Sequence, residues 1–172
     1  MALVIILGGA LAYAAYTHFA ASNPENSDMV PQPFIAVELE ATHLTGNIAP
    51  GDTKSMSAVV KNPGSALGMA YIRFSYPVNS SAVGAAGSVY TWQVNSGWSV
   101  VEEGTGYTVY GYSNPIDGDG STSSLMDSIT MKNMSPADFK TLGNDVNVQL
   151  IGYVAECSEY GDEVQAAWKA AN

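Results

Sequence analysis

The sequence predicts an all-β protein: an antiparallel β-sandwich of about eight strands with two short helices and an apolar N-terminal extension. Three observations predict this class. Short runs of alternating apolar and polar residues follow one another from residue 34 onward, turns rich in Gly, Pro and Asn separate them, and strands do not alternate regularly with helices. One main domain is expected, because 172 residues is close to the usual size of a compact domain.

The expected strands lie between recognisable turn signals. Ile35 to Thr42 alternates as a half-buried strand should. Met69 to Tyr76 is another strand, and it is stopped by Pro77, which has no N–H to donate to a sheet ladder. The other expected strands are residues 56–61, 89–94, 98–102, 107–112, 125–131 and 146–155.

Two short helices are expected within this pattern. In the first, Ser135 is the predicted N-cap and Pro136 the residue of the first turn. In the second, acidic residues from Glu159 to Glu163 precede apolar residues at helical spacing, including Val164 and Trp168.

Charge and composition exclude several classes of protein. Acidic residues outnumber basic ones 16 to 6, and the net charge of −10 argues against the basic surface that nucleic acid binding requires. The apolar content of 47% excludes a disordered chain of low hydrophobicity. Cys157 is the single cysteine, so no internal disulfide is expected and packing must supply the stability.

The chain divides into an apolar segment at residues 1–21, a proline-rich linker at 22–33 and the sandwich domain at 34–172. The first segment contains no Asp, Glu, Lys or Arg; as a helix it would reach about 28 Å, near the thickness of a bilayer's hydrocarbon core. Its small residues around Tyr13 resemble the cleavage region of an export signal. The first Lys is Lys54, however, so the basic start typical of signals and membrane anchors is missing.

The apolar segment is a candidate for contact between subunits. The linker of 12 residues can span up to ~40 Å, which allows the segment to reach a neighbouring molecule. An apolar strand from a neighbour can pair with the open edge of a sheet. A removed signal, a membrane anchor and a terminal helix packed on its own domain are the alternatives. The predicted interface residues are Leu3, Val4, Ile5, Ile6, Leu7, Leu11, Tyr13, Tyr16 and Phe19.

Four local patterns occur along the domain in a particular order. A proline–glycine turn, a strand and an asparagine turn occupy residues 48–65; Trp98 then precedes an aromatic strand, residues 107–112. A loop and strand follow at 114–129, and a last strand with an amphipathic tail at 146–168. In this order the patterns resemble the TasA/camelysin family of secreted, fibre-forming proteins, over about residues 34 to 171.

The resemblance implies a jelly-roll-like sandwich that is exported and polymerises into extracellular, cell-surface filaments or pili of a biofilm matrix. The N-terminal strand of one subunit would complete the sheet of the next, so the main partner is another copy, with matrix components as further partners. The membrane would be met only during export or anchoring. Two alternatives stay open: a type IV pilin-like subunit with a helical N-terminal core, and a membrane-anchored or secreted binding module.

No enzymatic activity, cofactor or metal is expected. His18 and His43 are the only histidines, and neither belongs to the two-histidine motif of zinc hydrolases. Residues 117–121 resemble the opening of a calcium loop, but Thr122 and Ser128 stand where Gly and a bidentate Glu are required.

Two further features concern sugars. Asn79 and Asn133 begin N-glycosylation sequons close to predicted turns. The tyrosines of residues 107–112 could bind glycans, but aromatic residues are common sheet formers, and filling of the core is the favoured interpretation.

Overall fold

The computed structural model describes residues 3–6, 37–41, 48–78, 88–142 and 147–156. Antiparallel strands dominate these residues, which confirms the predicted all-β class. The elements are β1 (Leu3–Ile6), β2 (Glu38–Ala41), β3 (Thr53–Ser55), β4 (Ala58–Lys61), β5 (Gly68–Ser75), β6 (Tyr90–Trp92), β7 (Trp98–Gly104), β8 (Tyr107–Tyr112), β9 (Ser128–Met131), α1 (Pro136–Leu142) and β10 (Gln149–Glu156).

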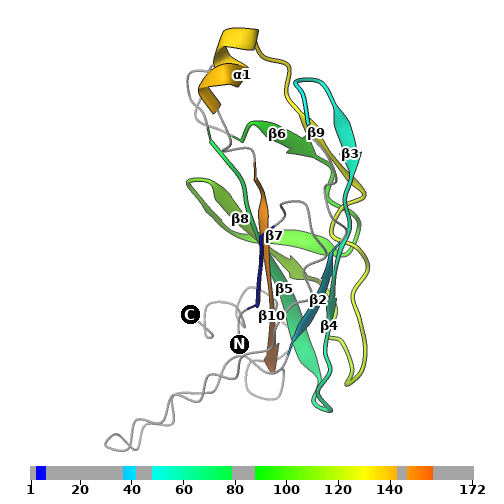
Figure 1. Cartoon of the computed structure of the whole chain (residues 1–172). Coiled ribbons are helices and arrows are strands. Elements are labelled where there is room, and N and C mark those ends of the chain that lie inside the picture. The colour runs from blue at the N-terminus through cyan, green and yellow to red at the C-terminus, as the bar shows by residue number, and fades with distance from the viewer. Residues whose placement is uncertain (1–2, 7–36, 42–47, 79–87, 143–146, 157–172) are drawn as a thin grey trace, which may run out of the picture.

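The strands form three sheets (Figure 1). The largest has five strands in the order β1-β10-β5-β8-β7, the second has three in the order β3-β9-β6, and the third pairs β2 with β4. Every strand pairing within the described residues is antiparallel. The strand order also brings together strands that are distant in sequence, such as β10 and β5.

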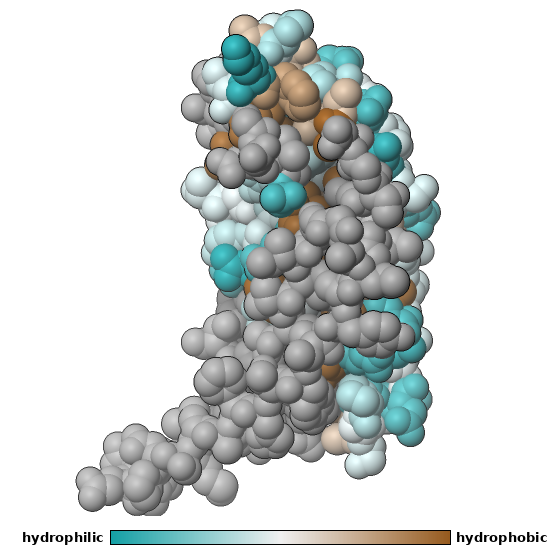
Figure 2. Space-filling model, viewed as in Figure 1, coloured by the Kyte–Doolittle hydropathy of each residue, from teal (hydrophilic) through white to brown (hydrophobic). Residues whose placement is uncertain are grey.

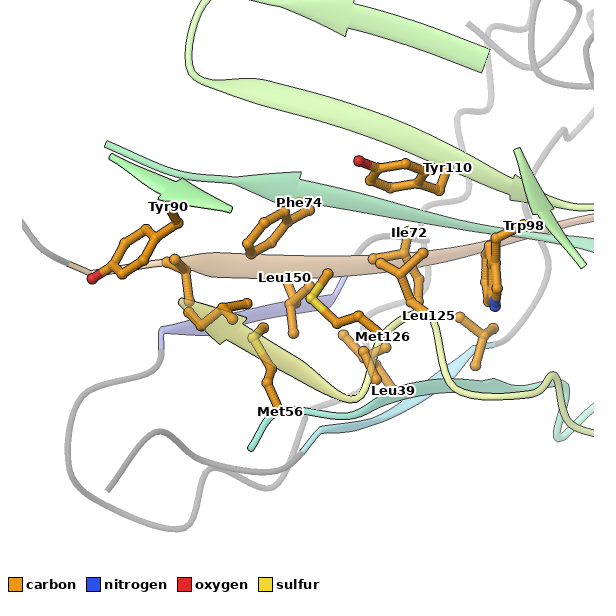
Figure 3. Close-up of a cluster of buried hydrophobic side chains, with 14 of the residues drawn as sticks. Leu39, Met56, Ile72, Phe74, Tyr90, Trp98, Tyr110, Leu125, Met126 and Leu150 are labelled. Carbon is orange, nitrogen blue, oxygen red and sulfur yellow. The ribbon is translucent and has the colours of Figure 1, made fainter. Parts of the chain in front are cut away.

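The main core lies between the five-stranded sheet and the two smaller ones. Ile72, Phe74 and Leu150 of the large sheet pack with Leu39 and Val60 of the β2–β4 pair, and Tyr90 and Ile129 of the three-stranded sheet belong to the same cluster. Figure 3 shows Leu39, Ile72, Phe74, Tyr90 and Leu150 among the side chains of this cluster that gather between the strands. The rings of Phe74 and Trp92, 4.8 Å apart and nearly perpendicular, join β5 to β6.

Each of the predicted strands overlaps an observed strand, but the estimate of about eight is too low, since ten are present in the described residues. The added strands are β1 and β3. The Thr-Lys-Ser sequence of β3 is too short and polar to show a period of its own, and its pairing with β9 makes it a strand. The predicted helix at Ser135 is confirmed; the one at 159–168 lies outside the described residues.

The start of α1 follows the predicted capping pattern. The backbone N–H of Asp138 donates to Ser135 Oγ at 3.1 Å, and the same hydroxyl donates to Asp138 Oδ2 at 2.7 Å. This arrangement satisfies one of the N–H groups that a helix leaves unpaired in its first turn.

Side-chain hydroxyls close the outer edge of β4. Segment 120–125 runs along this edge, and its Thr122 Oγ1 and Ser124 Oγ accept the N–H groups of Val60 and Ala58. The backbone N–H of Thr122 donates in return to Val60 O at 2.9 Å. The predicted strand 125–131 accordingly begins only at Ser128, because the preceding residues serve β4.

Burial of Tyr90 predicts a loss of stability in alkali. Burial raises the pKa of this phenol to about 12, against a value of about 10 in an unfolded chain. The stability that depends on the neutral phenol is present below about pH 10 and is lost as the pH rises through about 12. Circular dichroism during alkaline titration should show unfolding in this window, and Tyr90→Phe should move it to higher pH. Identical profiles for the two proteins would contradict this assignment.

Candidate assembly site at the edge of strand β10

Strand β1 forms one edge of the five-stranded sheet and pairs with β10 (Figure 1). The register is antiparallel, with Leu3 opposite Gly152, Val4 opposite Ile151, Ile5 opposite Leu150 and Ile6 opposite Gln149. The other side of β10 pairs with β5 along all 8 residues of β10. Strand β10 is therefore fixed on one side by the body of the sheet and offers its other side to β1.

The sequence of β10 suits a strand that is packed over a core. Leu150 and Val154 are buried in the main cluster, while Ile151 and Tyr153 between them lie on the opposite face and are partly exposed. Gly152 stands where strand β2 approaches: a Cβ there would lie 3.3 Å from Leu39 Cβ and 3.5 Å from Val37 Cγ2. Glycine allows this close approach, which holds β10 against the β2–β4 pair.

Four of the residues predicted to contact another subunit lie at this edge, where they pair within their own chain. Leu3, Val4, Ile5 and Ile6 form β1, so these four residues are a strand in the single chain, where they pair with the chain's own β10. The other predicted interface residues, Leu7, Leu11, Tyr13, Tyr16 and Phe19, lie outside the described residues, as does the linker 22–33.

Two other edge strands, β7 and β2, carry features that discourage pairing with a further strand. Strand β7 has an irregularity between Val100 and Glu102, followed by a second acidic residue, Glu103. Strand β2 exposes Glu38 and Glu40, and Glu40 forms an ion pair with Lys61. Charges and bulges protect edge strands. Strand β1, with the sequence Leu-Val-Ile-Ile, contains no charge or proline.

The exposed apolar side chains do not mark another such site. Leu67, Val78 and Val100, the large apolar residues that are exposed within the described ranges, belong to three different segments. On the face shown in Figure 2, teal and white residues cover most of the coloured surface, and the brown residues gather mainly at the end near α1. The candidate site is thus defined by backbone pairing at a sheet edge.

Two of the sequence patterns meet at Asn62, which the sequence predicted only as a turn residue. Its side chain is 0% exposed; Nδ2 donates to the carbonyl oxygens of Ala66, Ile116 and Asp117, while Oδ1 accepts the N–H of Gly64. A Cβ on Gly118 would lie 2.7 Å from Gly64 O, so the two loops touch through their backbones. In the sequence, the feature that could have pointed to this residue is the asparagine directly before Pro63-Gly64.

Residues 117–121, which resemble the opening of a calcium loop, form a turn that is hydrogen-bonded to the Asn62 loop. The backbone N–H of Asp119 donates to Asn62 O at 2.7 Å, and that of Gly120 donates to Asp117 O at 2.9 Å. Within the part of the chain that the structure describes, no three His, Cys, Asp or Glu side chains come close enough together to hold a metal ion. The segment acts as a turn that binds the Asn62 loop.

The tyrosines of β8 do not share one surface. Tyr110 belongs to the main core and is 4% exposed, whereas Tyr107 packs against the small cluster on the opposite face of the sheet. Filling of the core by Tyr110 agrees with the favoured interpretation. Of the two glycosylation candidates, Asn133 is exposed just after β9, and Asn79 lies outside the described residues.

Comparisons with protein-family models, with curated proteins and with solved structures give no match to this chain. The family resemblance therefore stays a prediction. No helix among residues 3–6, 37–41, 48–78, 88–142 and 147–156 is long and apolar enough to cross a membrane.

Proposed function

We propose that the protein is a structural subunit of an extracellular filament or pilus, with a jelly-roll-like sandwich as its body. Polymerisation occurs when the N-terminal segment of one copy pairs with β10 of the next. The observation that supports this proposal is the edge position of β1: an uncharged aliphatic strand pairs with β10 and lies far from the rest of its sheet in sequence.

The length of chain behind β1 allows exchange between copies. The segment between β1 and β2 comprises residues 7–37, and 31 residues can span up to about 100 Å when extended. The strand can then occupy β10 of its own chain or β10 of a neighbour with the same four residue pairs. Exchange of an identical element needs no new contact surface, and repeated head-to-tail exchange produces an open filament.

The pairing within the single chain defines the resting state of this subunit. A closed monomer has its own β1 on β10, which covers that edge along Gln149–Gly152. Assembly requires β1 to leave this edge before a neighbour's segment enters. We therefore expect assembly to be slow at first and to accelerate under conditions that open β1.

Engineered disulfides test which chain supplies β1. Val4 and Ile151 are directly opposite in the register, and such pairs lie close enough for cysteines to be joined. In a Cys157→Ser background, chains with Val4→Cys are mixed with chains carrying Ile151→Cys and allowed to assemble under oxidising conditions. A covalent dimer on a non-reducing gel is the expected result, because the two cysteines meet only through exchange.

The matched control replaces Ile151→Cys by Thr91→Cys, an exposed residue of β6 in a different sheet. This mixture should give no specific dimer. Filaments that form without the Val4–Ile151 link would contradict exchange at this edge. A protein that stays monomeric at every concentration would contradict the filament proposal and favour a binding module.

A further inference from the structure

The five-stranded sheet buries side chains on both faces. Besides the main core, Met69, Tyr71, Val109 and Ala155 form a second cluster on the opposite face, each at most 1% exposed. Arg73, the single arginine of the chain, lies on this second face between Val109 of β8 and Ile151 of β10.

Aromatic side chains surround the Arg73 guanidinium. Its central carbon lies 4.0 Å from the centre of the Tyr107 ring, a cation–π contact. Tyr153 hydrogen-bonds to Arg73 from the neighbouring strand. The Tyr107 hydroxyl donates to Glu102 Oε1 at 2.7 Å, so a carboxylate is bound to the same tyrosine whose ring Arg73 covers.

The Glu102 carboxylate acts electrostatically on both Tyr107 and Tyr153, but Arg73 itself forms no ion pair within the described residues. The ion pair found there joins Lys61 to Glu40, and none involves Arg73. The Nε atom of Arg73 is buried without a hydrogen-bond partner. Cations that are partly removed from water are normally paired, because an unpaired one is costly. An arginine stacked on an aromatic ring is also well suited to bind a carboxylate through its planar fork.

We propose that Arg73, Tyr107 and Tyr153 form a carboxylate-binding site, and that a second copy of this chain supplies the carboxylate in the filament. This inference rests on the proposed function. Charge complementarity supports the occupant: each copy carries 16 acidic residues and a net charge of −10, so neighbours repel except where a cation receives them.

The position of the site supports the same occupant. In the register, Arg73 pairs with Ile151, and Ile151 pairs with Val4 of β1. Two strand spacings separate Arg73 from β1, which corresponds to about 10 Å. A neighbour whose N-terminal segment enters beside β10 is therefore held within reach of the Arg73 site.

Charge variants of the full-length protein test this site. Arg73→Gln should raise the lowest concentration at which filaments form by about tenfold or more, as expected from the loss of one charge-assisted hydrogen-bonded contact. Arg73→Lys should have a smaller effect, because lysine keeps the charge but loses the planar fork. Lys140→Gln, an equal loss of charge at an exposed position of α1, should leave this concentration unchanged.

Thermal unfolding of the dilute monomers separates assembly from folding. If the Arg73→Gln variant does not fold, the Arg73→Lys variant is used for the assembly measurement instead. An unchanged lowest concentration for filament formation in Arg73→Lys overturns the inference. A folded Arg73→Gln that assembles like the wild type overturns it as well. Wild-type protein without filaments contradicts the proposed function itself, independently of Arg73.

The source of the carboxylate is tested on the same monomers. Sodium acetate and sodium chloride are compared at equal ionic strength. Equal melting temperatures in the two salts are expected if the carboxylate comes from a second copy. Stabilisation of the wild-type monomer by acetate, absent from Arg73→Gln, would overturn the second copy as the source and indicate a soluble carboxylate.

Discussion

Deletion of residues 1–33 is expected to leave a folded monomer that forms no filaments. The deletion removes β1 and the predicted linker and leaves every strand of the main core in place. The shortened chain can neither close its own β10 nor enter that of a neighbour. Size-exclusion chromatography with light scattering should show a monomer, and negative-stain electron microscopy should show no fibres at concentrations where the full chain assembles.

A single substitution within β1 should reproduce much of this loss. Ile5→Pro removes one backbone N–H from the strand and constrains its backbone, whereas Ile5→Val keeps a good strand former at the same place. We expect the proline variant to assemble far more slowly and the valine variant to assemble normally. Undiminished assembly by the deleted chain would exclude the N-terminal segment as the polymerising element.

Replacement of Asn62 by alanine is expected to lower the free energy of unfolding by about 3 kcal/mol or more, because buried hydrogen-bonding groups are left unpaired. Its Nδ2 lies 2.6 Å from Ala66 O, 3.4 Å from Ile116 O and 3.3 Å from Asp117 O, and its Oδ1 lies 3.1 Å from Gly64 N. Urea unfolding followed by tryptophan fluorescence measures the change, since Trp98 lies in the main core.

Asn114→Ala is the matched control, because Asn114 is exposed and lies in the partner loop, which supplies Ile116 O and Asp117 O to Asn62. Its effect should stay within about 0.5 kcal/mol. Asn62→Asp should destabilise at least as strongly as alanine at neutral pH, because it removes the donors and buries a charge. A loss of less than about 1 kcal/mol for Asn62→Ala would show that the two loops are held together by other contacts.

The strands and the cap of α1 could be predicted from the sequence because their causes are local. Residues 69–76 are predicted as a strand from their run of apolar and aromatic residues, which in the structure is buried on both faces over Met69–Ile72, and Pro77 ends that strand because it lacks an N–H. Ser135 caps α1 through a residue only three positions away. The candidate site was predicted in part. The apolar sequence of Leu3–Ile6 indicated a contact segment, but it did not show whether this segment forms a strand or a helix.

Pairing across the sheets depended on the tertiary structure. Leu3 of β1 lies opposite Gly152 of β10, although all the other strands lie between them in the sequence. No local pattern of apolar residues indicates that β10 is the partner of β1. Likewise, Arg73 in sequence is one polar position in an alternating strand, and its contact with Tyr107 exists only because β5 pairs with β8. Asn62 is a turn residue until the loop at 117–120 is folded against it.

The sequence by itself determined the all-β class, the approximate strands, the helix cap and the apolar character of the N-terminal strand. Only the tertiary structure decided the order of strands, the use of β10 as the edge that receives β1, and the neighbours of Arg73 and Asn62. The physical reason is that backbone propensity and burial pattern act over a few residues, whereas strand partners are selected by packing over the whole core.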